Sequence, residues 1–423
     1  MSDYLFAILE GGGHAPPMLS LVKALTGRGH NVRVLAQETL WDQVRAAGAA
    51  WVPWQRAPLA QLKGSPHDTG KRSPAAELAS IRDGLMCGPA AAFAADTRCE
   101  LRRRPADVVV ADHMLQGVLI GGQAEGARTA GVAMTFTCIP DWGVPAMGLG
   151  LTPSRAPAER LKAAMLRLAA ERKWGKGLPA INEARALNGL APISRPVELI
   201  ASADRLLVLV SRALEFPEFS PPGHVRLVGP RLEDPAWAGS WSPPPGDDPL
   251  VLVGLSSTWM DQVALLQRIA DALGRLPVRG LITTGPAVDP SAIAPPDNVH
   301  VVRAAPHGEV LQHAAAAVTH GGHGTVAKAL AAGVPLVCMP LGRDQPDVAA
   351  RVVRVGAGLR VDQDAARATI ALALHQVLGE RRYRHAARAL AVAIGFDRHR
   401  DRAGDELEAL AGVSAAAGEA ALA

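Results

Sequence analysis

Aromatic residues are scarce in this 423-residue chain. They make up 4% of it, and only two are tyrosines and six are phenylalanines. A core this aliphatic suits helices packed on buried strands. Cysteine is scarce as well: Cys87, Cys99, Cys138 and Cys338 lie far apart, with no CxxC pair to hold zinc or carry out redox chemistry. This cysteine usage indicates a reducing compartment.

Long apolar runs are also lacking. No stretch approaches the ~18 apolar residues that a membrane-spanning helix needs. The apolar residues 4–9 are too short for a signal peptide and lack its basic flank. We therefore expect a cytoplasmic protein without an integral membrane segment. The formal net charge of +4 is small for this length, so charge gives no reason to expect a nucleic-acid partner.

What the chain does contain is a regular alternation of short apolar runs and helical patterns. We expect strands at residues 4–9, 31–36, 107–111, 132–137, 206–210, 250–254, 278–283, 300–302, 316–319 and 334–339. The helical patterns between them include residues 17–27, 115–129, 261–274, 324–332 and 345–355. Buried strands that alternate with helices predict an α/β fold of parallel sheets covered on both faces.

Proline marks the division into domains. Residues 216–249 contain nine prolines and almost no hydrophobic periodicity, which is typical of a linker. We therefore expect an N-terminal domain at residues 1–220, a linker at 221–249, a second domain at 250–395, and a C-terminal helix with a frayed tail at 396–423.

A glycine-rich turn lies between an expected strand and an expected helix of the second domain. Its sequence is His320-Gly321-Gly322-His323-Gly324-Thr325. This arrangement aims free backbone N–H groups and the positive end of the helix dipole at an anion such as a diphosphate. A plain tight turn with satisfied histidines is the alternative. A metal site is disfavoured, because no carboxylate or cysteine stands at ligand spacing from the two histidines.

Two further polar loops follow neighbouring expected strands. Asp344 and Gln345 can together hold vicinal hydroxyls, since a carboxylate accepts hydrogen bonds and an amide both donates and accepts them. Ser257 and Thr258 form part of a Ser/Thr cluster after residues 250–254. Because ligands of open α/β sheets bind at the carboxyl ends of the strands, all three loops belong to one candidate site. Taken alone, the Ser/Thr cluster is equally a helix cap.

The first domain has a glycine-rich turn of its own, Gly11-Gly12-Gly13-His14, followed by two prolines. Pro16 stands where a dinucleotide-binding GxGxxG motif needs its third glycine, so that motif is excluded. Taken alone, His14 and Asp112 fit helix caps as well as catalytic groups.

These motifs together resemble the family-one glycosyltransferases of GT-B fold, especially the bacterial ones that decorate natural-product aglycones. The similarity is most specific over residues 299–361, "VHVVRAAPHGEVLQHAAAAVTHGGHGTVAKALAAGVPLVCMPLGRDQPDVAARVVRVGAGLRV", which resembles the family's donor-binding signature. "HAPPMLSLVKAL", from His14 onward, resembles the element that carries the family's general base, and "HVRLVGP" at 224–230 resembles its interdomain strand.

The resemblance implies two Rossmann-like, doubly wound domains that face each other across a cleft. It implies that His14 acts as general base, oriented by Asp112, in an inverting transfer from a nucleotide sugar to a small-molecule aglycone. The implied donor-binding residues are Ser257, Thr258, His320, Gly322, His323, Gly324, Thr325, Asp344 and Gln345. The helix N-terminus would stabilise the departing diphosphate, so no metal cofactor is expected.

Some positions depart from the family's pattern. Plant and animal members usually have a ribose-binding Glu where this chain has Lys328, and a Trp or Gln near the base where it has Ala304 and His307. Without the Glu the site lacks this hydrogen-bond acceptor for a ribose 2′-hydroxyl, so a dTDP-sugar is as good a candidate as a UDP-sugar.

The acceptor site is expected in the first domain. Apolar side chains that can line it, but that fit an ordinary core equally, are Trp54, Met86, Phe93, Trp142 and Met147. Two other functions remain open: a catalytically silent homologue that binds nucleotide or activates a partner enzyme, and an epimerase of nucleotide sugars. The epimerase would need further acidic groups beside Asp344. The sequence also leaves a homodimer open.

Overall fold

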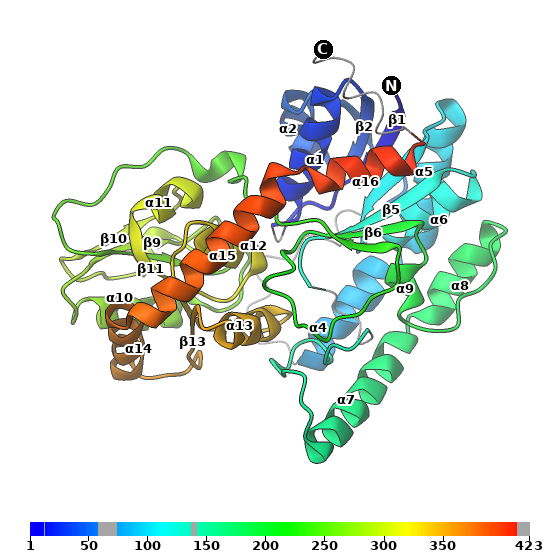
Figure 1. The fold of residues 1–423 in the computed structure, drawn as a ribbon. Coiled ribbons are helices and arrows are strands. Elements are labelled where there is room, and N and C mark those ends of the chain that lie inside the picture. Colours follow the sequence, from blue (N-terminus) through cyan, green and yellow to red (C-terminus); the bar gives the residue numbers. More distant parts are fainter. Residues whose placement is uncertain (12, 58–73, 137–141, 413–423) are drawn as a thin grey trace, which may run out of the picture.

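The computed structural model describes residues 1–11, 13–57, 74–136 and 142–412. Its strands form two parallel sheets (Figure 1). The first has the order β3-β2-β1-β4-β5-β6-β7, and the second β10-β9-β8-β11-β12-β13. The strands of the first are β1 (Asp3–Ala7), β2 (Asn31–Ala36), β3 (Ala50–Pro53), β4 (Val108–Asp112), β5 (Arg128–Ala133), β6 (Arg205–Val208) and β7 (Val225–Leu227). Those of the second are β8 (Leu250–Gly254), β9 (Arg279–Thr283), β10 (Val299–Val302), β11 (Ala314–Thr319), β12 (Leu336–Cys338) and β13 (Gly358–Arg360).

Helices connect the strands and pack against the sheets. In the first half they are α1 (Ala15–Gly27), α2 (Trp41–Ala46), α4 (Pro74–Ile81), α5 (Ala90–Arg103), α6 (Gln116–Ala124), α7 (Pro157–Gly175), α8 (Leu178–Leu187) and α9 (Glu198–Ala201). In the second half they are α10 (Val263–Leu273), α11 (His307–His313), α12 (His323–Ala331), α13 (Gln345–Arg354), α14 (Arg367–Gly379), α15 (Arg381–His399) and α16 (Arg402–Leu410). The central strands β4 and β8 are buried along their whole length. The predicted α/β fold with two doubly wound parallel sheets is confirmed.

One predicted strand is displaced. We expected a helix at residues 115–129 and a strand at 132–137, but α6 ends at Ala124 and β5 covers Arg128–Ala133. The cause is Gly126, whose φ of 76° ends the helix two residues after Ala124 and turns the chain into the strand early. Residues 137–141, at the end of the predicted strand, lie outside the described residues.

Two short strands, β3 and β13, were missed by the sequence-based prediction. Each lies at an edge of its sheet and has only three or four residues. Strand β7 lies within residues 224–230, where the family resemblance implied the interdomain strand. Strand β7 falls within residues 221–249, so the first sheet continues into the proline-rich segment.

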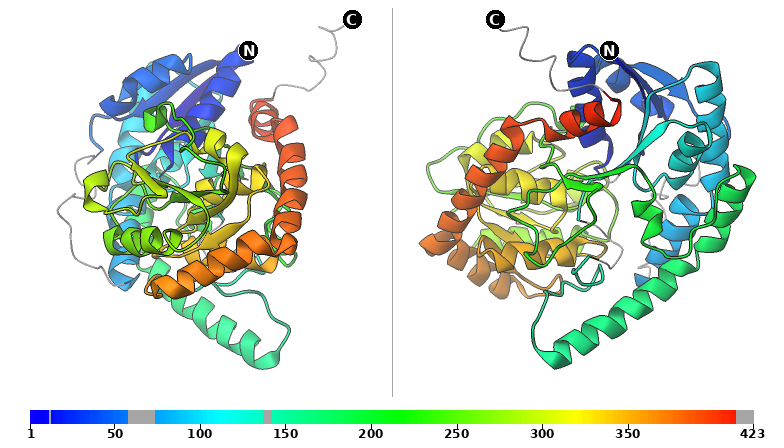
Figure 2. Two further views of the ribbon diagram at one scale, coloured as in Figure 1. Left: turned by 90° about the vertical axis from the view of Figure 1, so that its left-hand side faces the viewer. Right: turned by 45° about the vertical axis from the view of Figure 1, so that its right-hand side comes forward.

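The last two helices return from the second domain to the first (Figures 1 and 2). Helix α16 lies beside α1, where the Tyr4 hydroxyl donates to the Leu407 carbonyl at 3.3 Å and Arg28 pairs with Asp401 and Glu408. The chain therefore connects the two domains twice, once through the proline-rich segment and once through α15 and α16. In the part of the chain described here, no helix combines the length and apolar character needed to cross a bilayer.

Candidate active site

His14 and Asp112 meet at the centre of the first sheet. His14 lies between β1 and α1, and Asp112 is the last residue of β4, the strand that pairs with β1. The strand order reverses between β1 and β4, and ligands of open α/β sheets bind at that reversal. Nδ1 of His14 lies 2.5 Å from Oδ2 of Asp112. The structure thus brings together the two side chains expected to act in catalysis.

The surroundings of Asp112 keep it ionised. Its other oxygen, Oδ1, accepts the backbone N–H of Met114 at 2.9 Å and lies 3.4 Å from Nδ1 of His113. Burial alone would raise the pKa of Asp112, but the adjacent His14 and His113 hold it well below its usual range. A carboxylate on Nδ1 holds the proton there and leaves Nε2 of His14 free to accept one. The His14 side chain is 22% exposed, so a substrate can reach it.

The three polar loops of the second domain also converge at a strand-order reversal. They follow β8, β11 and β12, which lie side by side in register Gly254↔Thr319 and Thr319↔Cys338. The order reverses between β8 and β11. The sequence-based expectation that these loops share one sheet edge is therefore met by the register.

Helix α12 begins in the glycine-rich turn with an open N-terminus. Gly322 is its N-cap and His323 its first residue. Gly324 is exposed, and a Cβ there would meet no heavy atom within 4 Å. The first-turn N–H groups of a helix have no partner within the helix, so the turn can receive an anion beside Gly324 and Thr325.

His320 lies against this turn. A Cβ on Gly322 would be 2.6 Å from Nε2 of His320, so only glycine fits beneath the ring. Nδ1 of His320 lies 3.5 Å from the Thr319 hydroxyl. Burial, with nearby Arg343 adding to it, lowers the pKa of His320 to about 4. A hydrogen bond to the Gly254 backbone opposes this shift. At neutral pH His320 therefore carries no positive charge, and its single N–H can donate either to the Gly254 backbone or to a bound anion.

His323 points elsewhere. Its ring packs edge-to-face on Phe136 of the first domain, with centroids 5.4 Å apart. Burial lowers its pKa to about 4, although a hydrogen bond with the Met134 backbone opposes the shift. His323 therefore contributes to the anion turn only as the first residue of α12, and its side chain belongs to the contact between the domains.

Thr258 lies in the Ser/Thr loop that follows β8. Its hydroxyl is 3.0 Å from that of Ser256 and 3.5 Å from Nη1 of Arg343. Ser257, between the two hydroxyl residues, is partly exposed. Arg343 was assigned no role from the sequence, yet its guanidinium brings a positive charge to the rim of the anion turn. Its place beside Asp344 in the same loop was the available signal.

Asp344 and Gln345 differ in how they are placed. Asp344 is partly exposed and its Oδ2 accepts the hydroxyl of Thr135, from the first domain, at 2.7 Å. Gln345 is buried: Oε1 accepts the backbone N–H groups of Leu341 and Gly342 at 2.8 and 3.1 Å. Its Nε2 donates to the sulfur of Met260 at 3.3 Å, a weak bond that a sugar hydroxyl can replace.

Lys328 forms an ion pair with Asp234, from the proline-rich segment. The second oxygen of Asp234 accepts the backbone N–H of Gly308 at 2.9 Å. Lys328 stood out in the sequence, but its partner did not. An acid 94 residues away in a segment without periodicity gives no signal of this contact.

The five apolar candidates for the acceptor site divide into two groups. Met86 and Phe93 are completely buried in the core, beneath the surface. Trp54, Trp142 and Met147 are partly exposed. Trp54 packs edge-to-face on Phe93 and Trp142 on Phe219. The three partly exposed side chains are therefore those that can touch a ligand in this arrangement.

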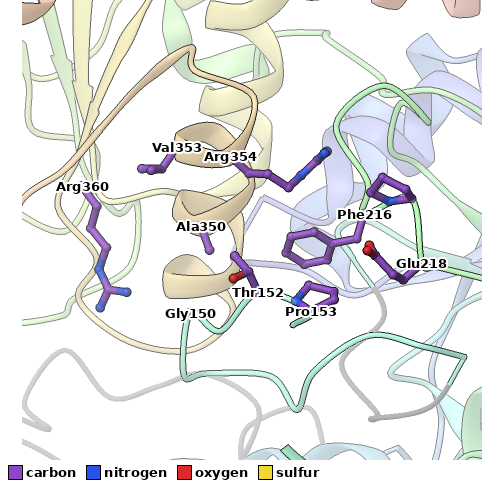
Figure 3. A pocket seen from close by; sticks show the side chains of 10 residues that line it. Gly150, Thr152, Pro153, Phe216, Glu218, Ala350, Val353, Arg354 and Arg360 are labelled. Atoms are coloured by element: carbon purple, nitrogen blue, oxygen red, sulfur yellow. The ribbon is translucent and has the colours of Figure 1, made fainter. Parts of the chain in front are cut away.

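A pocket of about 580 Å³ lies between residues of the two domains (Figure 3). It is lined by the second half of α13, by Arg360, by residues 150–153 and by residues 216–218. None of the site residues expected from the sequence lines it.

Two parallel-sheet domains, each with a polar site at its strand-order reversal, define an enzyme of GT-B architecture. Solved structures agree with this fold. CalG4, the calicheamicin glycosyltransferase, has a TM-score of 0.75 at 24% identity, covering 98% of this chain and 99% of that one. The glycotransferase of kitacinnamycin has a TM-score of 0.76 at 22% identity, covering 97% and 98%.

Sequence relatives identify the family. The model of the family "Erythromycin biosynthesis protein CIII-like, C-terminal domain" matches residues 267–395. 4'-Demethylrebeccamycin synthase of Lentzea aerocolonigenes is 30% identical over 91% of this chain and 94% of that protein. Demethyllactenocin mycarosyltransferase of Streptomyces fradiae is 26% identical over 85% and 75%. The chain belongs to the family-one glycosyltransferases of bacterial natural-product biosynthesis. It is a sugar-transferring enzyme.

Proposed function

We propose that this enzyme transfers a sugar from a dTDP- or UDP-sugar to a hydroxyl or amine of a lipophilic natural product, with inversion at the anomeric carbon. The observation that carries the proposal is the 2.5 Å contact between His14 and the buried Asp112. The open N-terminus of α12 supplies the complementary site for the donor diphosphate. The relatives' names, which include a 4'-demethylrebeccamycin synthase and a demethyllactenocin mycarosyltransferase, support a small-molecule acceptor.

In the proposed reaction, Nε2 of His14 takes the proton from the acceptor hydroxyl or amine. The acceptor atom then attacks the anomeric carbon from the side opposite the diphosphate, so one displacement inverts the configuration. Asp112 stabilises the imidazolium that forms and holds its orientation. Positioned base catalysis of this kind contributes ~10²–10⁴-fold to rate.

The leaving diphosphate is stabilised at the start of α12. The backbone N–H groups of the first turn, the Thr325 hydroxyl and the neutral His320 donate to its oxygens, and the charge of Arg343 lies at the rim. Asp344, with Gln345 once its amide leaves Met260, binds the sugar hydroxyls. Because these groups balance the charge, we propose that turnover needs no metal ion. Activity lost in EDTA and restored by Mg²⁺ would contradict this.

The test is to incubate the enzyme with nucleotide sugars and with polyphenolic or polyketide acceptors, and to analyse products by mass spectrometry and anomeric NMR couplings. A glycoside of inverted configuration supports the proposal. Nucleotide binding without any product across the panel favours the catalytically silent homologue. The ionised Asp112 on His14 argues against that alternative, because a silent protein has no use for an accessible imidazole oriented by a buried carboxylate.

A further inference from the structure

Helix α13 is attached to the first domain along one face. Asp344 lies at its N-cap, and Asp347 and Arg351 follow at spacings of three and four residues, which places all three on one side of the helix. Each bonds to a different segment of the first domain. The helix that carries the proposed sugar-binding carboxylate belongs to the second domain by sequence, yet its position is set largely by the first.

The far end of α13 is fixed by a buried ion pair. Nε and Nη2 of Arg351 both donate to Oε1 of Glu215, at 2.8 and 2.6 Å. Both side chains are almost fully buried, with 4% and 1% exposed. The guanidinium also lies 3.9 Å from the ring centroid of Phe136 and 4.2 Å from that of Phe216. A charge enclosed by a carboxylate and two aromatic faces has one well-defined position.

The middle of α13 is fixed by backbone hydrogen bonds. The N–H groups of Gly148 and Gly150 donate to the two oxygens of Asp347, at 2.6 and 2.9 Å. Both glycines have positive φ, 94° and 63°, so the loop is folded around this carboxylate. Burial raises the pKa of Asp347 to about 6, which leaves it mostly ionised at neutral pH and able to accept both bonds.

We propose that Glu215, Asp347 and Arg351 are positioning residues for the donor sugar. They hold α13 against the first domain and thereby place Asp344 where the sugar binds. Most of the proposed diphosphate contacts lie at α12 and around Thr258; Arg343, at the rim of the turn, is the one that stands directly before α13. Loosening α13 should therefore weaken recognition of the sugar far more than recognition of the nucleoside diphosphate. This inference rests on the proposed function.

The test compares Glu215→Gln and Asp347→Asn with the wild type. Glu218→Gln is the matched control, because this nearby carboxylate is exposed at the rim of the pocket (Figure 3). Calorimetry measures the Kd of the free nucleoside diphosphate and of the nucleotide sugar. We expect the first Kd to stay within twofold in all variants. The second should rise at least fivefold in Glu215→Gln and Asp347→Asn, but not in Glu218→Gln.

Hydrogen exchange supplies a readout independent of turnover. The amides of residues 148–150 should exchange at least fivefold faster in Asp347→Asn, because an asparagine has one acceptor oxygen for two N–H donors. Unchanged exchange there would overturn the attachment. Asp347→Asn also leaves the buried ion pair intact, so it provides the affinity test if Glu215→Gln fails to fold.

The outcomes separate the two claims. A wild-type enzyme that binds no nucleotide sugar contradicts the proposed function. A wild type that binds, with variants that bind the nucleotide sugar equally well, contradicts the positioning role. Equal losses of affinity for the nucleoside diphosphate and the nucleotide sugar would assign the residues to general stability, and would also overturn the inference.

Discussion

A Cβ on Gly321 would lie 2.9 Å from the carbonyl oxygen of Gln345, and the φ of Gly321 is 89°. The anion turn and the start of α13 are thus packed backbone to backbone. Gly324, three residues on, faces open space instead. The two glycines therefore serve different purposes, close packing in one case and ligand approach in the other.

Gly321→Ala should reduce stability, whereas Gly324→Ala should reduce ligand binding. Gly321→Ala should destabilise the protein by about 1–3 kcal/mol, because alanine is strained at this φ and clashes with the neighbouring loop. Gly324→Ala should leave the Tm unchanged or slightly raised, since alanine favours helix, yet weaken nucleoside diphosphate binding at least tenfold by filling the approach to the N–H groups. Thermal denaturation and calorimetry on both proteins check this. Full affinity in Gly324→Ala would place the diphosphate elsewhere.

His320 should act as a neutral hydrogen-bond donor. Its pKa of about 4 means that the imidazole carries no charge at neutral pH. His320→Ala should raise the donor KM and lower kcat, reducing kcat/KM roughly 10–100-fold, the usual cost of a lost hydrogen bond to a charged group. His320→Gln keeps an N–H donor and should retain more activity than the alanine variant. Equal losses in both would show that the imidazole contributes something other than a neutral N–H.

The Lys328–Asp234 pair should leave the enzyme without a preference for a ribose 2′-hydroxyl. We expect dTDP to bind at least as tightly as UDP in calorimetry. The double variant Lys328→Glu/Asp234→Lys keeps an opposite-charge pair but places a carboxylate on α12, and should shift the preference toward UDP. A tenfold or greater preference of the wild type for UDP, ~1.4 kcal/mol, would show that another group binds the ribose.

His323 should make stability depend on pH. Its pKa is about 4 in the folded protein, below the ~6.5 of an exposed histidine. The unfolded chain therefore binds more protons between these values, so the free energy of unfolding falls as pH drops from about 6.5 to 4. His323→Phe, which keeps a ring against Phe136, should reduce the loss of stability between pH 7 and pH 5 by roughly 1–2 kcal/mol. Urea denaturation at both pH values measures this. An unchanged pH dependence would contradict it.

Long, buried strands and the loops that follow them could be predicted from the sequence. The strands at 31–36 and 250–254 were placed at their observed bounds because continuous apolar runs mark them. The polar loops were assigned to one sheet edge from topology alone. The short edge strands β3 and β13 were missed, and β7 was expected only from the resemblance of residues 224–230 to the family's interdomain strand.

Side-chain directions and long-range partners could not be predicted. No local pattern indicates that the His323 ring turns to the first domain or that Gln345 accepts hydrogen bonds from its own loop. Glu215 and Arg351 lie 136 residues apart, and no local pattern links them. The pairing of His14 with Asp112 was expected only from the family resemblance, because neither residue alone differs from a helix cap.

We propose that His14, held by Asp112, removes the acceptor proton. Asp112→Asn should lose activity in the same direction as His14→Ala, because an amide favours the wrong imidazole tautomer. In the double variant the loss should be far smaller than the product of the two single losses, since the residues act as one unit.

The most direct measurement is the turnover of His14→Ala with an aliphatic alcohol and with an acidic phenol as acceptors, in protein shown to fold and to bind the donor nucleotide as the wild type does. We predict that kcat falls ~10²–10⁴-fold with the alcohol. The loss should be smaller with the phenol, which ionises with less help. Wild-type turnover of the alcohol by His14→Ala would show that His14 is not the general base.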